Sequence, residues 1–317
     1  MNSQPIAVID VGSNSVFLMV VALDTRYRPV LLERRKDNAR LGAALDLDGG
    51  FTEAAIARLV ATMQRFREVA DRHDAEVYGV ATAAVRRANN GATAIARVAQ
   101  EAGIDIEVIS PEKEAEMVYL GVLFGRVVGQ ERVLCADVGG GSTEIVLGQA
   151  GQVLAVDSAP VGAVVLTEEL LGNAPVSSTR IETARNTLVD LFSDFRDRLS
   201  GQRWQSAVAT SGSIQRIARM VLVTGGLAAD SDIDGMTVTQ EDLAELITRI
   251  GSAPSLEAIK ALAGIDHKRA DILLAGALIY HELGRALSIE RWTVSLAGLR
   301  MGMFAHQLHR RGELRLP

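Results

Sequence analysis

A loop of one acidic residue followed by glycine and hydroxyl side chains occurs twice in this chain, each time directly after an apolar run. The copies are Asp10-Val-Gly-Ser-Asn-Ser15 and Asp137-Val-Gly-Gly-Gly-Ser-Thr143, after the runs 6–9 and 133–136. Apolar, β-branched runs of this length predict buried strands, and strand-like segments also follow both loops. A strand, a tight turn and a second strand form a hairpin whose backbone N–H groups can hold phosphate oxygens. Two copies predict two related lobes that bind one phosphorylated ligand between them.

Glycine with serine or asparagine between strands is also typical of an ordinary hairpin turn. For a single loop of this kind, the ordinary turn is the better interpretation. Three consecutive glycines, 139–141, exceed the needs of a turn and increase the entropy lost on folding. Together with the duplication, they favour phosphate binding. A third loop, Ser211-Gly-Ser213, precedes a predicted helix whose first N–H groups could also receive an anion.

Composition limits the possible functions. A chain of 317 residues suits two domains, and 48% apolar with 4% aromatic residues indicates aliphatic cores. The single cysteine, Cys135, is expected to be a small core residue in a reducing compartment. No apolar run approaches the ~18 residues of a membrane helix, and the N-terminus lacks the layout of a signal peptide, so a cytoplasmic protein is expected. A net charge of −6 argues against a nucleic-acid partner.

The hydrophobic periodicity predicts an α/β protein in which the first half of the chain is repeated by the second. Each half is expected to begin with three hairpin-connected strands and to continue with alternating helices and strands. The predicted strands are 5–10, 15–23, 29–36, 76–82, 104–109, 132–137, 143–148, 152–157, 207–210 and 291–295. The predicted helices are 52–72, 92–103, 110–124, 177–199, one from 214, 239–250, 255–262, 267–286 and one from 296.

The motifs of several enzyme classes are missing from the sequence. It contains no Walker loop, no HExxH, no nucleophile elbow and no Cys/His zinc spacing. What remains is a set of carboxylates beside phosphate-binding loops, which indicates magnesium-assisted phosphate chemistry.

A series of short motifs then carries a specific resemblance. In order, they are the first loop at 10–15, Arg40-Leu-Gly42, Thr82-Ala-Ala-Val-Arg86, Ser110-Pro-Glu-Lys-Glu-Ala115, the second loop at 137–144, Ser211-Gly-Ser213 and Gly298-Leu-Arg-Met-Gly302. The chain resembles, over nearly its whole length, the exopolyphosphatase and guanosine pentaphosphate phosphatase (Ppx/GppA) family, in the short form without an HD-type domain. The resemblance implies two ribonuclease-H-like lobes of the actin, Hsp70 and sugar kinase superfamily around a cleft. We expect the lobes at 1–125 and 126–296, with the final helix, 297–317, packed back on the first.

The resemblance also implies roles for individual residues. Glu114 falls on the catalytic carboxylate that activates water, whereas the residues alone leave Glu112 as an equal candidate. Arg86 falls on an arginine in the loop after a strand, where its fork can hold a phosphoryl group. Three carboxylates match positions associated with magnesium: Asp137, Glu144 and Asp10. The expected phosphate contacts are Gly12, Ser13, Asn14, Ser15, Gly139, Gly140, Gly141, Ser142, Thr143, Ser211, Gly212 and Ser213.

The resemblance implies Mg²⁺ as cofactor, with Mn²⁺ as an alternative and a monovalent cation such as K⁺ as a further candidate. Inorganic polyphosphate is the expected substrate, guanosine pentaphosphate a second one, and a homodimer the expected assembly, without a nucleic-acid or membrane partner. Two other functions stay open: a small-molecule kinase of the same superfamily, and a sensor that binds guanosine tetra- or pentaphosphate without hydrolysis. The chain departs from the family pattern at Phe17, where arginine or histidine is common, at Met301, where glutamate is usual, and at Arg87, which gives two adjacent arginines.

Overall fold

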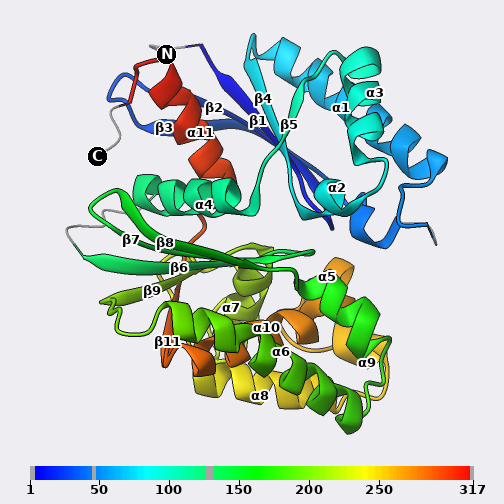
Figure 1. Cartoon of the computed structure of the whole chain (residues 1–317), viewed down its shortest axis with the longest axis vertical. Coiled ribbons are helices and arrows are strands. Elements are labelled where there is room, and N and C mark those ends of the chain that lie inside the picture. Colours follow the sequence, from blue (N-terminus) through cyan, green and yellow to red (C-terminus); the bar gives the residue numbers. More distant parts are fainter. Residues whose placement is uncertain (1–3, 45–47, 126–130, 315–317) are drawn as a thin grey trace.

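The computed structural model describes residues 4–44, 48–125 and 131–314, and these form two lobes. The first lobe contains a five-stranded sheet of order β3-β2-β1-β4-β5 (Figure 1). β1, β2 and β3 are antiparallel neighbours, whereas β4 and β5 run parallel to β1. The strands are β1 (Ile6–Val11), β2 (Val16–Leu23), β3 (Pro29–Asp37), β4 (Glu76–Ala81) and β5 (Ile106–Val108).

The second lobe repeats this arrangement. Its six-stranded sheet has the order β10-β11-β9-β6-β7-β8, so that β6 to β9 and β11 correspond to β1 to β5, and β10 is an added antiparallel edge. The strands are β6 (Arg132–Val138), β7 (Thr143–Gln149), β8 (Gln152–Ala159), β9 (Ser206–Thr210), β10 (Thr237–Thr239) and β11 (Arg291–Val294). The shared strand order makes both lobes ribonuclease-H-like, as the family resemblance implies.

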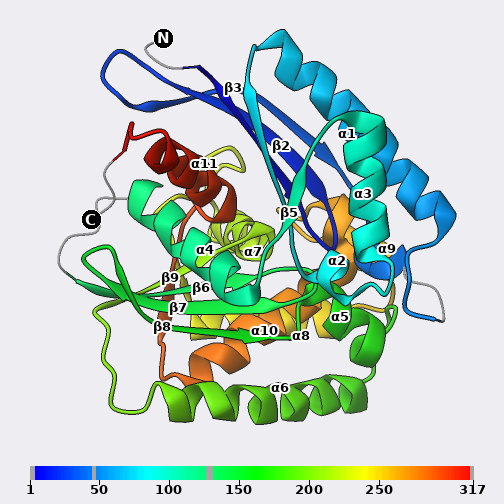
Figure 2. The same ribbon diagram turned by 45° about the horizontal axis from the view of Figure 1, so that its top comes forward.

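Helices cover the outer face of each sheet, because each buries one apolar side there. Figure 2 shows α1 (Glu53–Arg72) and α3 (Gly91–Ala102) outside the first sheet, and α6 (Ser178–Arg198), α8 (Gln240–Gly251) and α10 (Leu273–Ala286) outside the second. The remaining elements of this lobe are α5 (Ala163–Leu166), η2 (Thr167–Leu171), α7 (Gly212–Thr224), α9 (Leu256–Lys260) and η3 (His267–Ile272). No helix in the described ranges is long and apolar enough to cross a bilayer.

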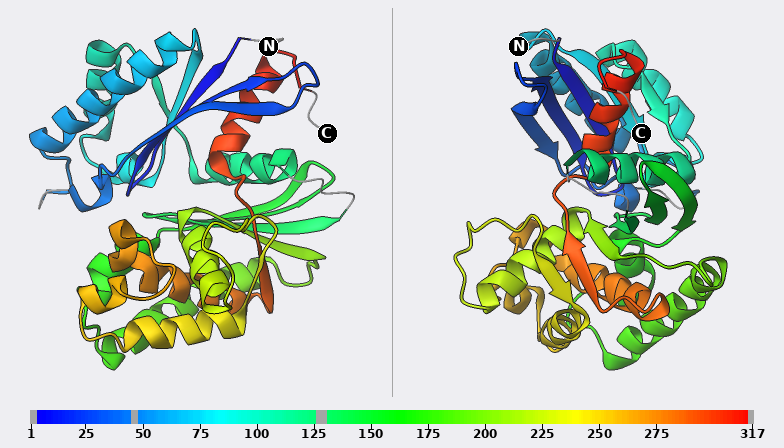
Figure 3. Two further views of the ribbon diagram at one scale, coloured as in Figure 1. Left: turned by 180° about the vertical axis from the view of Figure 1, so that it is seen from behind. Right: turned by 90° about the vertical axis from the view of Figure 1, so that its left-hand side faces the viewer.

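Two helices lie between the sheets, α4 (Pro111–Gly125) and α11 (Leu299–Arg310) (Figure 3). α11 packs in the core of the first lobe, where Met303, Phe304 and Leu308 are buried with residues of β1. α4 instead buries Val118 and Tyr119 against the sheet of the second lobe.

α4 and α11 cross backbone to backbone. A Cβ atom on Gly121 would overlap the carbonyl oxygen of Gly298, and one on Gly302 would overlap the carbonyl oxygen of Met117. Such a close approach is open only to glycine, because any side chain would separate the helices. The crossing joins the two lobes at one side of the space between them.

The predicted strands are confirmed, and so are the long helices, except that the helix predicted at 267–286 is divided into the 3₁₀ helix η3 and the α-helix α10. Five short elements were not foreseen: η1 (Leu41–Ala44), α2 (Ala83–Arg87), α5, η2 and β10. They have three to five residues each, too few for a hydrophobic period to emerge. One consequence concerns Arg86, which lies on α2 and not, as expected, in a loop.

Candidate active site

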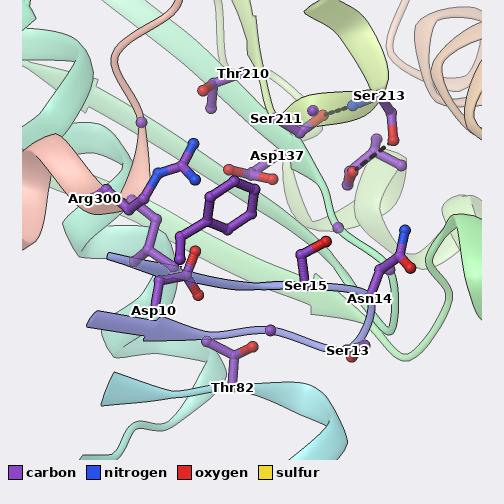
Figure 4. A pocket seen from close by; sticks show the side chains of 18 of the residues that line it. Asp10, Ser13, Asn14, Ser15, Thr82, Asp137, Thr210, Ser211, Ser213 and Arg300 are labelled. Carbon is purple, nitrogen blue, oxygen red and sulfur yellow. Dashed lines mark hydrogen bonds between the residues drawn. The ribbon is translucent and has the colours of Figure 1, made fainter. Parts of the chain in front are cut away.

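A cleft of about 480 Å³ lies between the lobes, and most of the residues expected at the site line it (Figure 4). The expected residues that line it are Asp10, Gly12, Ser13, Asn14, Ser15, Glu114, Asp137, Gly139, Gly140, Gly141, Ser142, Ser211, Gly212 and Ser213. Arg86, Thr143 and Glu144 are not in its lining.

The two duplicated loops have the same backbone geometry. In β1 and β2, Asp10 pairs with Phe17, and the loop is closed by a 3.1 Å hydrogen bond from Gly12 N to the carbonyl oxygen of Ser15. In β6 and β7, Asp137 pairs with Glu144, and the corresponding bond from Gly139 to Ser142 is 3.0 Å long. The duplication seen in the sequence is therefore a duplication of structure.

Both loops line the cleft, and they come into contact there. A Cβ atom on Gly140 would lie 3.2 Å from Cβ of Ser13, and one on Gly141 would overlap Oγ of Ser13. Behind the second loop, the first N–H groups of α5, from Ala163 and Val164, donate to the carbonyl oxygens of Gly139 and Gly140 at 2.9 Å. Gly140 and Gly141 thus allow the second loop to pack closely against Ser13 of the first.

The third loop joins β9 to the 13-residue helix α7. Oγ of Ser211 caps this helix by accepting a hydrogen bond from Ser213 N at 3.0 Å. Ser211 has φ 116° and ψ 165°, a conformation that is normally open only to glycine and that costs on the order of 1–3 kcal/mol. Strain of this kind concentrates at functional sites, and here it sets the N-terminus of α7 against the cleft.

Buried Glu114, at one wall of the cleft, pairs with half-buried Arg86. Glu114 lies in the first turn of α4 and is 7% exposed. Its Oε2 accepts a 2.8 Å hydrogen bond from Nη1 of Arg86, which also donates to the carbonyl oxygen of Ile109 at 2.8 Å. Arg86 therefore lies behind Glu114. Glu112, the equal candidate from the residues alone, is exposed and outside the lining of the cleft.

Burial raises the pKa values of the carboxyl groups at the site. For Glu114, burial raises the pKa to about 7, against the opposing effect of Arg86 and with help from Asp137 and Asp10. For Asp137, burial and the charge of Asp10 raise the pKa to about 7. The pKa of Asp10 is also raised by burial, and that of Glu144 is raised well above its ordinary value by burial and by Glu114. Desolvation dominates at every one of these groups.

The carboxylates do not by themselves make a complete metal site. Within the described residues, no group of three or more His, Cys, Asp or Glu side chains is arranged to hold a metal ion. Asp10 and Asp137 nevertheless offer oxygen ligands in the cleft, and their mutual repulsion would be relieved by a cation. They fit Mg²⁺, which usually takes only one or two protein carboxylates together with phosphates and water. Glu144 lies behind them, where it accepts a hydrogen bond from Ser158 Oγ at 3.3 Å.

Six basic residues that were not among the expected site residues also line the cleft: Arg34, Arg35, Lys36, Arg216, Arg269 and Arg300. Nη2 of Arg269, on η3, crosses between the lobes to donate to Oγ of Ser15 at 2.6 Å. Arg300 stacks on the ring of Phe17, with its guanidinium carbon 3.9 Å from the ring centroid. Burial and the charges of Arg269 and Arg216 lower the pKa of Lys36 to about 8. Four of these residues had a signal in the sequence: Arg34, Arg35 and Lys36 form a short basic run, and Arg300 lies in the motif Gly298-Leu-Arg-Met-Gly302.

The comparisons with known proteins agree with this geometry. Residues 20–311 match the model of the Ppx/GppA phosphatase family. Over 307 residues the chain is 31% identical to "Exopolyphosphatase 1" of Mycobacterium tuberculosis, which covers 96% of this chain and 88% of the relative. It superposes on the crystal structure of the Aquifex aeolicus member of the family with a TM-score of 0.82 and 26% identity, over 97% of this chain and 98% of that one. An exopolyphosphatase structure from Cytophaga hutchinsonii shares the fold, with a TM-score of 0.86, 24% identity and 98% coverage of both chains. By sequence and by structure, the chain belongs to the Ppx/GppA phosphatase family.

Proposed function

We propose that this protein is an exopolyphosphatase that releases the terminal phosphate of inorganic polyphosphate, one phosphate at a time. Family membership and the exopolyphosphatase names of its relatives support this function. The observation that carries the proposal is the position of Glu114, a buried carboxylate in a cleft lined by both phosphate-type loops. Such a cleft suits a ligand with a terminal phosphate, which the loops can bind and which a water molecule activated by Glu114 can attack.

In the proposed reaction, the backbone N–H groups of the two loops hold the oxygens of the terminal phosphate. Glu114 accepts a proton from a water molecule as that water attacks the terminal phosphorus. The bond from phosphorus to the bridging oxygen breaks, and the products are orthophosphate and a chain shorter by one phosphate. A pKa of about 7 for Glu114 is suited to this task, because a general base works best when its pKa lies near the working pH.

Arg86 has a supporting part in this proposal. Its contacts with Glu114 and with the carbonyl oxygen of Ile109 orient the carboxylate. A direct contact of Arg86 with the phosphoryl group, expected from the sequence, stays a prediction. Asp10 and Asp137 are the residues that would hold Mg²⁺, with Glu144 behind them. The bound ion would offset the negative charge of the phosphate oxygens.

A phosphate-release assay tests the function directly. Long polyphosphate, short polyphosphate, guanosine pentaphosphate and ATP are compared with and without Mg²⁺, with Glu114→Gln as the inactive control. Release from polyphosphate that requires Glu114 supports the proposal. ATP-dependent phosphorylation of a small acceptor without release from polyphosphate would indicate a kinase instead. Tight binding of guanosine pentaphosphate with no turnover of any compound would indicate a sensor.

A further inference from the structure

The position of the Arg300 side chain, at the start of α11, does not stabilise the helix. It lies in the first turn of α11, with its guanidinium group stacked on Phe17. Its Nη1 is buried and has no hydrogen-bond partner among the described residues. Figure 4 shows the guanidinium group beside Asp137 in the cleft, with Asp10 close by.

Both features of this placement are unfavourable for folding. A cation in the first turn of a helix opposes the helix dipole. A buried charged donor without a partner loses its hydration, and nothing in the protein replaces it. The stacking on Phe17 offsets part of this cost and fixes the plane of the guanidinium group. A donor that is buried, oriented and unpaired in a cleft is suited to an anionic ligand.

Arg300 also lies between two groups of opposite charge. The acidic group consists of Asp10, Glu114 and Asp137, and the basic group consists of Arg34, Arg35, Lys36, Arg216 and Arg269. The charges that act on Arg300 come from both, since they are those of Asp10, Asp137, Arg34 and Arg216. The charges that act on Glu114 are those of Arg86, Asp137 and Asp10, whereas Lys36 is affected mainly by Arg269 and Arg216. Arg300 thus stands at the boundary, with the proposed base on one side and most of the cations on the other.

This order indicates how a polyphosphate chain would lie in the cleft. The terminal phosphate belongs beside Glu114 and the loops, and the remaining phosphates belong beside the basic group, where their charge is compensated. The bond that breaks would then lie near Arg300. As that bond breaks, negative charge moves to the bridging oxygen, and a fixed guanidinium group stabilises such charge.

We propose that Arg300 is a further catalytic residue, which binds the phosphate next to the one released and stabilises the leaving oxygen. Phe17 is its positioning residue, because the ring holds the guanidinium plane. The role of Arg300 in turnover rests on the proposed exopolyphosphatase activity. Its binding of the second phosphate can be tested without turnover. Phe17 departs from the family pattern, in which arginine or histidine is common. Its ring does not supply a positive charge itself but holds that of Arg300.

The test compares orthophosphate with pyrophosphate by titration calorimetry in the Glu114→Gln background, where the ligand is not consumed. Orthophosphate fills only the terminal position, and pyrophosphate also reaches the next one. We expect Arg300→Gln to weaken pyrophosphate binding at least about tenfold, the scale of one charge-assisted hydrogen bond, and orthophosphate binding by less than about twofold. An equal effect on the two ligands, or no effect on either, would overturn the assignment.

Arg198→Gln is the matched control, because Arg198 stacks on Phe195 at 5.4 Å on the outer surface of the second lobe. It should leave both affinities unchanged. Arg300→Lys keeps the charge but loses the planar fork, and it is the second variant if Arg300→Gln fails to fold. It too should weaken pyrophosphate binding more than orthophosphate binding. An unchanged ratio of the two affinities would overturn the proposal. Phe17→Leu keeps an apolar side chain without the ring face and should reduce the same selectivity in part, whereas a merely structural role would affect both ligands alike.

The two proposals can fail separately. A wild-type enzyme that releases no phosphate from polyphosphate would refute the proposed function, while the calorimetric comparison would still decide whether Arg300 binds the second phosphate. With phosphate release established, Arg300→Gln should lower kcat for polyphosphate at least about tenfold. An unchanged kcat with a raised KM would limit Arg300 to binding and would refute its role at the leaving oxygen.

Discussion

Nη1 of Arg86 lies 2.8 Å from Oε2 of Glu114, and the pair is held in place by the carbonyl oxygen of Ile109, which accepts from the same nitrogen. The arginine therefore acts on the carboxylate from behind and lowers a pKa that burial raises. This contact makes the proposed base sensitive to a residue that does not line the cleft.

Arg86→Gln should move the pH dependence of phosphate release to higher pH. Arg86 favours the ionised form of Glu114, so its removal raises the pKa of the base, and a higher pH is needed to ionise it. The measurement is kcat/KM for polyphosphate from pH 5.5 to 9.5. Arg87→Gln is the control, because Arg87 is more exposed and pairs with Glu169, at 3.7 Å, rather than with Glu114. A lower kcat/KM with an unchanged dependence on pH would show that Arg86 does not set the pKa of Glu114.

Glu114→Gln should reduce kcat for polyphosphate at least about a hundredfold, the usual scale for loss of a general base. The fold should persist, because glutamine keeps the shape of the side chain and can still accept from Arg86. Phosphate release under saturating substrate measures the effect, with Glu112→Gln as the exposed control on the same turn of α4. Full turnover in Glu114→Gln would remove this residue from the mechanism.

The same substitution should stabilise the protein in alkaline solution. The folded-state pKa of Glu114, about 7, exceeds its ordinary value of 4.5. Stability contributed by such a group is complete below about pH 4.5 and is lost as the pH rises through 7. A neutral glutamine avoids this loss. At pH 8, the free energy of unfolding of Glu114→Gln should therefore exceed that of the wild type by on the order of 2 kcal/mol.

Denaturant unfolding at pH 5 and pH 8 measures this difference, and Asp137→Asn should behave in the same way because the pKa of Asp137 is also raised to about 7. Glu112→Gln again serves as control, since the pKa of exposed Glu112 is lowered by its hydrogen bond to Ser110 and its substitution should give no gain at pH 8. A gain of the same size at pH 5 and pH 8 for Glu114→Gln would contradict the raised pKa.

Gly141→Ala should separate the two loops. The added methyl group would overlap Oγ of Ser13 and lie 3.0 Å from Cβ of Ala83, so one loop must move. We expect a loss of about 1–3 kcal/mol in unfolding free energy and weaker orthophosphate binding. Gly225→Ala is the control, because a methyl group there meets its nearest atoms at 3.4 Å or more. Unchanged phosphate affinity in a folded Gly141→Ala protein would show that the loops do not jointly bind the ligand.

The parts of the site that sequence analysis predicts well are those encoded by local pattern. Hydrophobic runs with glycine and serine turns set the two hairpins, and the structure reproduces them with matching registers, Asp10 opposite Phe17 and Asp137 opposite Glu144. The choice between Glu112 and Glu114 was not a local matter. Both lie in the first turn of α4, and only the packing of that helix on the second lobe exposes one and buries the other.

The basic residues of the cleft illustrate what local pattern cannot reveal. Arg269 reaches Ser15 from a part of the chain 254 positions away, and Arg300 meets Phe17 only because α11 returns to the first lobe. Arg300 has no basic neighbour in the sequence, and Arg269 follows only Lys268. Their contribution depends on tertiary contacts between distant segments, which no hydrophobic period or turn signature encodes.

The glycine crossing of α4 and α11 has a consequence for how the enzyme can move. Glu114 and Arg300 lie in the first turns of these two helices, whose main chains touch at Gly121 and Gly302. Any swing of one half of the molecule against the other that keeps this joint intact must carry both first turns together. Opening would then widen the gap at the loops, at Ser13 and Gly141, while the spacing between base and arginine stayed constant. The enzyme would admit and release its substrate while the two groups proposed to act on the bond stayed together.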